Sequence, residues 1–422
     1  MRSTPLRLRR SLALTLLPCL YLCPSRTSAQ AIEAGYAKGD ILKIGQWLNL
    51  EGGLKQQDAQ SFWLGYVYQT SDKENCGYAS DFNYPTFTFG LLVADFNKVT
   101  FRYNPHGTRP IDYDSRCGTS YALYASIRRS FFRTRSGWSA DYRFSNGIGY
   151  NTHIYNRYTN VDNIMLGSRL SVYFDAAIAL NYRYRQYEIF VSPEFRHLSN
   201  GGLVRPNKGI NKVGVGGGIR YYLQPYDSIS FRRTRTPFEG KRLYLNLTYA
   251  TGLRASQGEW LYDNNNYIWN TNDVDNIKYG KDGYRLCYYH LISTDLMYRY
   301  ARRYASGIGL DVLYEPYNLD IETQVPGNRP NQVLWSFGLA AKHEVFYHRL
   351  SMKMALGWYL SRPFNEYSHT DEEYPFYERI GLRYNLPILK DCISIGYNIY
   401  AHLTKAYGTE VVIDFNIPCI KR

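Results

Sequence analysis

The fold is decided by stretches such as residues 350–360, which read LSMKMALGWYL. Every second residue from Leu350 to Leu360 is large and apolar, whereas the residues between them are mostly small or polar, Lys353 included. Successive side chains of a β-strand point to opposite faces, so this stretch predicts a strand with one apolar and one polar face. Such a strand suits a transmembrane barrel, in which one face meets lipid and the other a polar interior.

The same alternation recurs over most of the chain, and the connections between the predicted strands follow a second pattern. Tight turns near Arg135, Arg185, Arg303, His348 and Lys390 alternate with long polar loops. Outer-membrane barrels have short turns on one side and longer loops on the other. We therefore predict an all-β fold, an antiparallel transmembrane outer-membrane β-barrel of about 14–16 strands, with 12 possible. The long loops are expected at residues 104–117, 150–167, 252–283, 316–331 and 361–375, and the medium-length connection 224–240 is an exception on the tight-turn side.

Residues 1–29 predict a secretory signal peptide. Arginines at positions 7, 9 and 10 precede an apolar stretch, and small residues up to Ala29 suit a cleavage site. The rest of the chain offers no run of roughly 20 apolar residues, so an embedded chain has to be a closed barrel. The 43 Tyr and the mean hydropathy of −0.43 agree with aromatic girdles around a wet interior. We predict that residues 30–422 form a single barrel in the outer membrane.

The net charge and the cysteines of the chain limit its possible partners and cofactors. The formal net charge of +14 fits a surface that meets anionic phosphates, and solvated Lys and Arg on loops explain it equally well. Nucleic acid is excluded for an exported chain without a binding motif. We predict a disulfide between Cys76 and Cys117, because both fall in polar, loop-like segments of an exported chain. No His/Cys spacing indicates a metal, and no cofactor is expected.

One strand departs from the ordinary pattern at its end. Residues 187–199 begin with Ile189 on the apolar face and Glu194 on the luminal face, and continued alternation puts His197 and Ser199 on the lipid face. Residues i and i+2 of a strand have neighbouring Cβ atoms, so the imidazole can take the hydroxyl proton during attack on an ester carbonyl. The pair alone is also typical of polar residues at a barrel rim. Its lipid-facing position is the reason to expect a lipid substrate.

The following residues extend the pattern and carry a resemblance. His197-Leu198-Ser199-Asn200-Gly201-Gly202 and the return segment PNKGIN at 206–211 resemble the core motif of the lipid A deacylase (PagL) family, often labelled acyloxyacyl hydrolases. The close match covers residues 188–222, and the whole chain looks like a longer relative with a larger barrel. The resemblance implies an outer-membrane esterase that removes an ester-linked 3-hydroxyacyl chain from lipid A of lipopolysaccharide, without a metal.

Carried over by position, Ser199 would be the nucleophile, His197 the general base, and backbone around Asn200 and Gly202 the oxyanion hole. Asn211 stands where the best-known members have Glu. An Asn carbonyl orients the imidazole but adds no charge to stabilise the imidazolium, as in the Cys-His-Asn set of papain-like proteases. Three cations near the motif would hold the glucosamine phosphates or serve only as rim charges, namely Arg205, Lys208 and Lys212.

Two other classes of function remain open from the sequence. A passive channel or hydrophobic-solute transporter would use the polar lumen and treat the His/Ser pair as decoration. A surface-binding barrel would use the long loop 252–283 with its aromatic residues, which are Trp260, Tyr262, Tyr267 and Trp269. The oligomeric state is open as well.

Overall fold

The structure is a computed structural model. It describes residues 29–42, 54–72, 77–102, 113–225, 229, 231–232, 237–255, 260, 286–316, 334–362, 375–402 and 405–421. The predicted signal peptide therefore lies outside the described residues apart from Ala29, which opens the first strand. None of the helices in this part of the chain reaches the length and hydrophobicity that a membrane-spanning helix requires.

The first eight strands form one closed antiparallel barrel. They are β1 (Ala29–Ile41), β2 (Leu54–Gln69), β3 (Thr86–Phe101), β4 (Ser115–Arg133), β5 (Trp138–Asn151), β6 (Leu170–Tyr184), β7 (Tyr187–Ser199) and β8 (Ile210–Tyr222). The short helix α2 (Gly77–Asp81) lies between β2 and β3. The barrel closes because β8 pairs with β1, with Tyr222 opposite Ala31.

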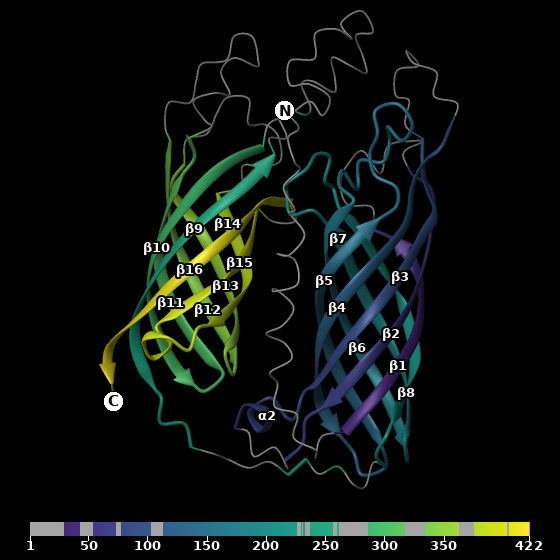
Figure 1. Cartoon of the computed structure of the whole chain (residues 1–422), viewed down its shortest axis with the longest axis horizontal. Coiled ribbons are helices and arrows are strands. Elements are labelled where there is room, and N and C mark those ends of the chain that lie inside the picture. Colours follow the sequence, from purple (N-terminus) through teal and green to yellow (C-terminus); the bar gives the residue numbers. More distant parts are fainter. Residues whose placement is uncertain are drawn as a thin grey trace, which may run out of the picture.

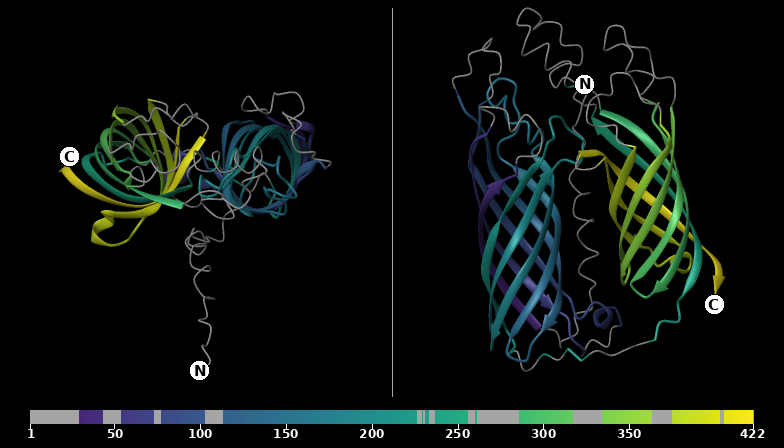
Figure 2. Two further views of the ribbon diagram at one scale, coloured as in Figure 1. Left: turned by 90° about the horizontal axis from the view of Figure 1, so that it is seen from above. Right: turned by 180° about the vertical axis from the view of Figure 1, so that it is seen from behind.

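The remaining eight strands form a second closed antiparallel barrel. They are β9 (Arg242–Ala255), β10 (Leu286–Ala301), β11 (Tyr304–Tyr314), β12 (Trp335–Tyr347), β13 (Leu350–Ser361), β14 (Phe376–Asn385), β15 (Ile393–His402) and β16 (Lys405–Lys421). The 3-10 turn η7 (Leu389–Asp391) joins β14 to β15. Closure is between β16 and β9. Figures 1 and 2 show the two barrels side by side.

The all-β antiparallel class and the number of strands are confirmed, but the prediction of a single barrel for residues 30–422 is wrong. The cause is the pairing of β8, which returns to β1 instead of accepting β9 as a neighbour. The connection predicted at 224–240, the exception among the tight turns, is the link between the barrels. Its described residues, such as 237–240, lie at the same end of the molecule as the tight turns, as Figure 1 shows.

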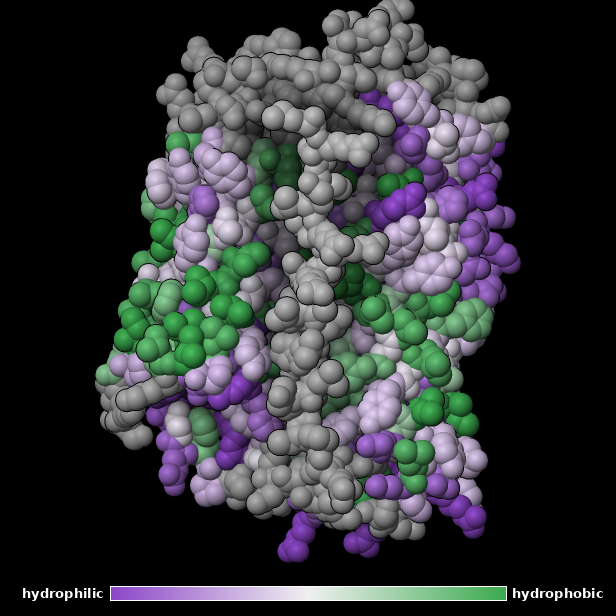
Figure 3. Space-filling model, in the orientation of Figure 1, coloured by the Kyte–Doolittle hydropathy of each residue, from purple (hydrophilic) through white to green (hydrophobic). Residues whose placement is uncertain are grey.

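The outer faces of the strands are apolar. Along β13, Leu356, Trp358 and Leu360 are exposed, while Ser351 and Lys353 are buried in the interior, as the sequence predicts. In Figure 3, apolar residues gather in the middle of the visible face of both barrels, with hydrophilic residues toward the ends. This distribution suits a lipid bilayer.

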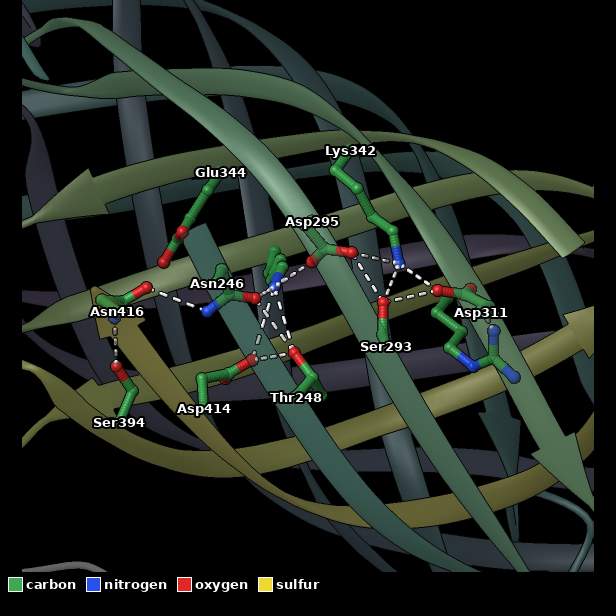
Figure 4. Close-up of polar contacts among 12 residues, drawn as sticks. Asn246, Thr248, Ser293, Asp295, Asp311, Lys342, Glu344, Ser394, Asp414 and Asn416 are labelled. Carbon is green, nitrogen blue, oxygen red and sulfur yellow. Dashed lines mark hydrogen bonds and ion pairs between the residues drawn. The ribbon is translucent and has the colours of Figure 1, made fainter. Parts of the chain in front are cut away.

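The interiors are filled by buried ion pairs rather than by water-lined space. In the first barrel, Glu188 pairs with Arg128 at 2.9 Å and with Arg220 at 2.6 Å. Lys353 of the second barrel pairs with Asp295 at 2.9 Å and Asp414 at 3.3 Å, and this network continues along the interior in Figure 4. Eight strands enclose only enough room for side chains to fill.

The two barrels touch at more than one level. At the end with the tight turns, Asp81 of α2 forms an ion pair with Arg302 at 3.2 Å, and Tyr78 accepts a hydrogen bond from Arg299 at 3.0 Å. In the middle part of the strands, the Tyr397 hydroxyl on β15 donates to Asn146 Oδ1 on β5 at 2.8 Å. Side chains of both barrels therefore fix their relative position.

The predicted disulfide between Cys76 and Cys117 is wrong. Cys117 is a free, buried thiol near the start of β4, at the end of the barrel that carries the long loops. Cys76 lies outside the described residues.

Candidate active site

The geometry of the candidate site begins with the alternation of β7. Glu188, Ser192 and Glu194 are buried inside the first barrel, whereas Ile189 and Val191 are exposed outside it. The same alternation continues through Pro193 and Phe195 and brings His197 and Ser199 to the outer face, where the strand ends. The sequence-based placement of this pair on the outer face agrees with the structure.

The neighbouring strand supplies the third side chain. Asn211 on β8 lies directly opposite His197 in the antiparallel register, so their side chains share the outer face. Asn211 Oδ1 is 2.7 Å from His197 Nδ1, and His197 Nε2 is 2.8 Å from Ser199 Oγ. The amide oxygen as acceptor implies a proton on Nδ1, which leaves Nε2 free to accept the hydroxyl proton.

The three side chains are shielded from solvent although they lie on the outside of the barrel. Ser199 is only 7% exposed, and His197 and Asn211 are half-buried. A hydrogen-bonded Asn-His-Ser chain with a shielded hydroxyl is the arrangement that activates serine as a nucleophile. Glu194, the carboxylate nearest in sequence, is inside the barrel and pairs with Arg196 at 2.8 Å, so it does not contact the imidazole.

The turn after Ser199 is held by its own side chains. Asn200 N–H donates to Asn207 Oδ1 at 3.0 Å, and Gly202 N–H donates to Asn200 Oδ1 at 3.1 Å. Both predicted oxyanion donors are thus already engaged. In the described residues, the donors of this turn for which no acceptor is found include the Gly201 N–H and the side-chain N–H₂ of Asn207. Asn207 belongs to the motif recognised in the sequence, but its contact with the Asn200 backbone depends on how the turn folds.

The predicted substrate-binding cations divide into three different environments. Lys212 lies inside the barrel and pairs with Glu194 at 3.4 Å, so its prediction as a substrate-binding residue is wrong. The alternation of β8 explains this, because residues 211 and 212 must face opposite sides. Arg205 is buried and donates from Nε to the Ala255 carbonyl of the second barrel at 2.8 Å. Lys208 remains half-buried at the turn.

The structure adds a cation that the sequence analysis missed. Lys405, the first residue of β16, is within electrostatic reach of Arg205 and Lys208 although it belongs to the second barrel. No sequence signal links positions 208 and 405, because their proximity follows from the packing of the barrels. Elsewhere in the described residues, no group of three or more His, Cys, Asp or Glu side chains is arranged to hold a metal ion.

Comparison with protein families decides the assignment. The family model described as "Lipid A 3-O-deacylase (PagL)" matches residues 86–220, and the one described as "Acyloxyacyl hydrolase, C-terminal domain" matches residues 269–418. The chain belongs to the PagL family. The first match covers β3 to β7 and most of β8, with the Asn-His-Ser chain, and the second covers β10 to β15 and most of β16. Family and barrel fold together support a hydrolase of the outer membrane.

Comparison with solved structures returns outer-membrane channels at low similarity. An outer membrane channel from Pseudomonas putida F1 is 9% identical, with 94% of this chain and 99% of that chain covered and a TM-score of 0.23. The monoaromatic hydrocarbon channel TodX, in a mutant form, is 9% identical, with 94% and 92% covered and a TM-score of 0.18. These TM-scores are too low to indicate a function for this PagL-family chain. A comparison with curated proteins found no match.

Proposed function

We propose that this PagL-family protein is an esterase that removes an ester-linked 3-hydroxyacyl chain from lipid A. The observation that carries the proposal is the continuous hydrogen-bonded chain from Asn211 through His197 to Ser199 on the outer face of the first barrel. A water-soluble substrate would not reach a face that is otherwise covered by Ile, Val and Phe side chains. An acyl ester in the outer leaflet reaches this face sideways.

The reaction divides between the residues as follows. His197 Nε2 takes the proton from Ser199 Oγ while the oxygen attacks the ester carbonyl. The sugar hydroxyl leaves with that proton, and the acyl group remains on Ser199. Water, deprotonated by the same imidazole, then attacks the acyl-serine, and the hydroxy fatty acid is released. Asn211 holds the imidazole in the tautomer that both steps require.

The developing oxyanion needs donors close to the nucleophile. The Asn200 and Gly202 N–H groups are engaged within the turn. We therefore assign this role to the Gly201 N–H and the Asn207 amide, which follow Ser199 in the same turn. Lys208 and Lys405 would meet the negatively charged phosphates of lipid A, because both belong to the cationic group beside this turn.

A passive channel is the weaker candidate. Its lumen would have to cross the interior of a barrel, and both interiors are occupied by buried ion pairs such as Glu188 with Arg220 and Lys342 with Asp311. The surface-binding alternative depends on loop 252–283. Most of that loop lies outside the described residues, Tyr262, Tyr267 and Trp269 included, while Trp260 packs edge-on against Tyr155 with ring centroids 5.9 Å apart.

The test is mass spectrometry of lipid A incubated with the refolded full chain and with Ser199→Ala in mixed micelles. We expect the wild type to release one hydroxyacyl mass, and Ser199→Ala to release none above the rate in protein-free micelles. Hydrolysis of equal extent by both proteins would refute Ser199 as the nucleophile. An unchanged lipid A spectrum with the wild type, over a range of detergents and pH values, would refute the activity itself.

A further inference from the structure

The second barrel contacts the turn that follows the nucleophile. Ala255 N–H, at the end of β9, donates to the Gly202 carbonyl at 2.8 Å, and the Ala255 carbonyl accepts from Arg205 Nε at 2.8 Å. Thr409 Oγ1, on β16, donates to the Gly201 carbonyl at 3.1 Å. Residues 200–209 are therefore fixed from one side by the barrel that carries the catalytic strand and from the other by the second barrel.

The two glycines of the turn are required by this contact. A Cβ atom on Gly201 would lie 2.3 Å from Thr409 Oγ1, and one on Gly202 would lie 2.8 Å from the Tyr407 carbonyl oxygen. Both residues also have positive φ, +66° and +83°. A side chain at either position would push the turn away from the second barrel.

The contact is built next to reacting atoms. Gly201 is two residues after Ser199, and its N–H is one of the donors assigned to the oxyanion. The hydrogen bond from Thr409 to its carbonyl limits rotation of the Gly201 residue. The Tyr397–Asn146 hydrogen bond supports the same arrangement, because Asn146, Phe174, His197 and Asn211 lie opposite one another across β5 to β8.

We propose that the second barrel is a positioning element of the hydrolase site, in which Thr409 holds Gly201 in the conformation that the reaction of Ser199 requires. This inference rests on the proposed function. Thr409 is a positioning residue, since it acts through Gly201 and contacts no reacting atom. The second barrel thereby has a role although its own interior is filled with ion pairs.

The test compares full-length variants of Thr409. Thr409→Val removes the hydroxyl and keeps the shape, and Thr409→Ser keeps the hydroxyl. Thr251→Val is the matched control, because Thr251 is exposed on the neighbouring strand β9. Two rates are measured: labelling of Ser199 by a fluorophosphonate, which needs no lipid, and kcat and KM for lipid A. Thermal unfolding is recorded for each variant.

We expect Thr409→Val to lower the labelling rate and kcat by about threefold to tenfold, the effect of one hydrogen bond, with KM within about twofold of wild type. Thr409→Ser restores the rates and Thr251→Val leaves them unchanged. If Thr409→Val does not fold, Tyr397→Phe removes a different inter-barrel hydrogen bond, that to Asn146, and is expected to slow labelling by about twofold.

The outcomes separate the two proposals. Ser199-dependent labelling at wild-type rate in both Thr409→Val and Tyr397→Phe would overturn the positioning role while leaving the nucleophile in place. Ser199-dependent labelling of the wild type without hydrolysis of lipid A would overturn the proposed substrate, and the labelling rates of the variants would still decide the role of Thr409. Absence of any Ser199-dependent labelling in wild type would overturn both.

Discussion

Asn211, the hydrogen-bond acceptor opposite His197, is the residue whose replacement we expect to raise the activity. Asn211→Asp keeps the size of the side chain, and Oδ1 is already 2.7 Å from Nδ1, so a carboxylate oxygen can take the same position. The carboxylate stabilises the imidazolium that forms when Ser199 loses its proton. An Asn carbonyl offers the same geometry without the charge.

The size of the gain follows from the hydrogen bond that changes. Bonds to charged groups contribute about 1.5–3 kcal/mol and neutral ones about 0.5–1.5 kcal/mol, so the difference of about 1–2 kcal/mol corresponds to an increase in kcat of roughly 5-fold to 30-fold. The effect stays well below the about 10⁴-fold loss that Asn causes in a serine protease triad, because that loss reflects the wrong tautomer. Here Asn211 Oδ1 already selects the correct one.

The assay is the initial rate of hydroxyacyl release from lipid A by folded protein. Asn146→Asp is the control, since it adds a carboxylate to the same outer row of residues without facing the imidazole. We expect no gain from it. Asn211→Ala, which removes the acceptor, should lose activity. A rate for Asn211→Asp at or below wild type, with an unchanged melting temperature, would refute the argument that the missing charge limits this site.

Three further predictions concern the turn and the interiors. Asn207→Ala removes an assigned oxyanion donor, and we expect kcat to fall by about 10²–10³-fold; a loss confined to KM would contradict the assignment. Glu194→Gln leaves the charges of Arg196 and Lys212 less compensated inside the first barrel. It should lower the free energy of unfolding, measured by urea titration, by about 3–5 kcal/mol. An unchanged midpoint of unfolding would show that the buried charges are solvated. In planar bilayers the wild type should show no stable conductance, because both interiors are filled; a steady open-channel current would contradict that packing.

Much of the fold could be predicted from the sequence because the alternation of side chains is local. The strand expected at residues 187–199 has the bounds Tyr187–Ser199, and the faces of residues 350–360 are as predicted. Strand pairing is not local. The alternation of a strand carries no information on which strand closes a sheet, so two barrels of eight and one of sixteen have the same pattern. The exceptional connection at 224–240 was the one sequence signal for the division.

The candidate site shows the same limit. The outward direction of His197 and Ser199 and the match to Asn211 could be predicted from period-two counting and the motif. The hydrogen bonds of Asn200 to Asn207, and the contacts of Gly201 and Gly202 with the second barrel, depend on turn geometry and on packing between distant segments. The prediction for Lys212 was wrong because it relied on the closeness of this residue to the motif in the sequence. The alternation of β8 turns its side chain into the barrel.

The pairing of Ala31 with Tyr222 also bears on how the chain reaches its native state. The first sheet closes on a segment that ends before β9 begins, so closure of that sheet does not wait for the C-terminal half. A ring of sixteen strands would instead have to bring β1 and β16 together across the whole chain, at a greater cost in loop-closure entropy. Two smaller barrels allow the chain to fold in two steps, each over a shorter length of sequence. The strand that carries Ser199 is paired when the first barrel closes, and the turn that follows it is fixed when the second barrel has formed.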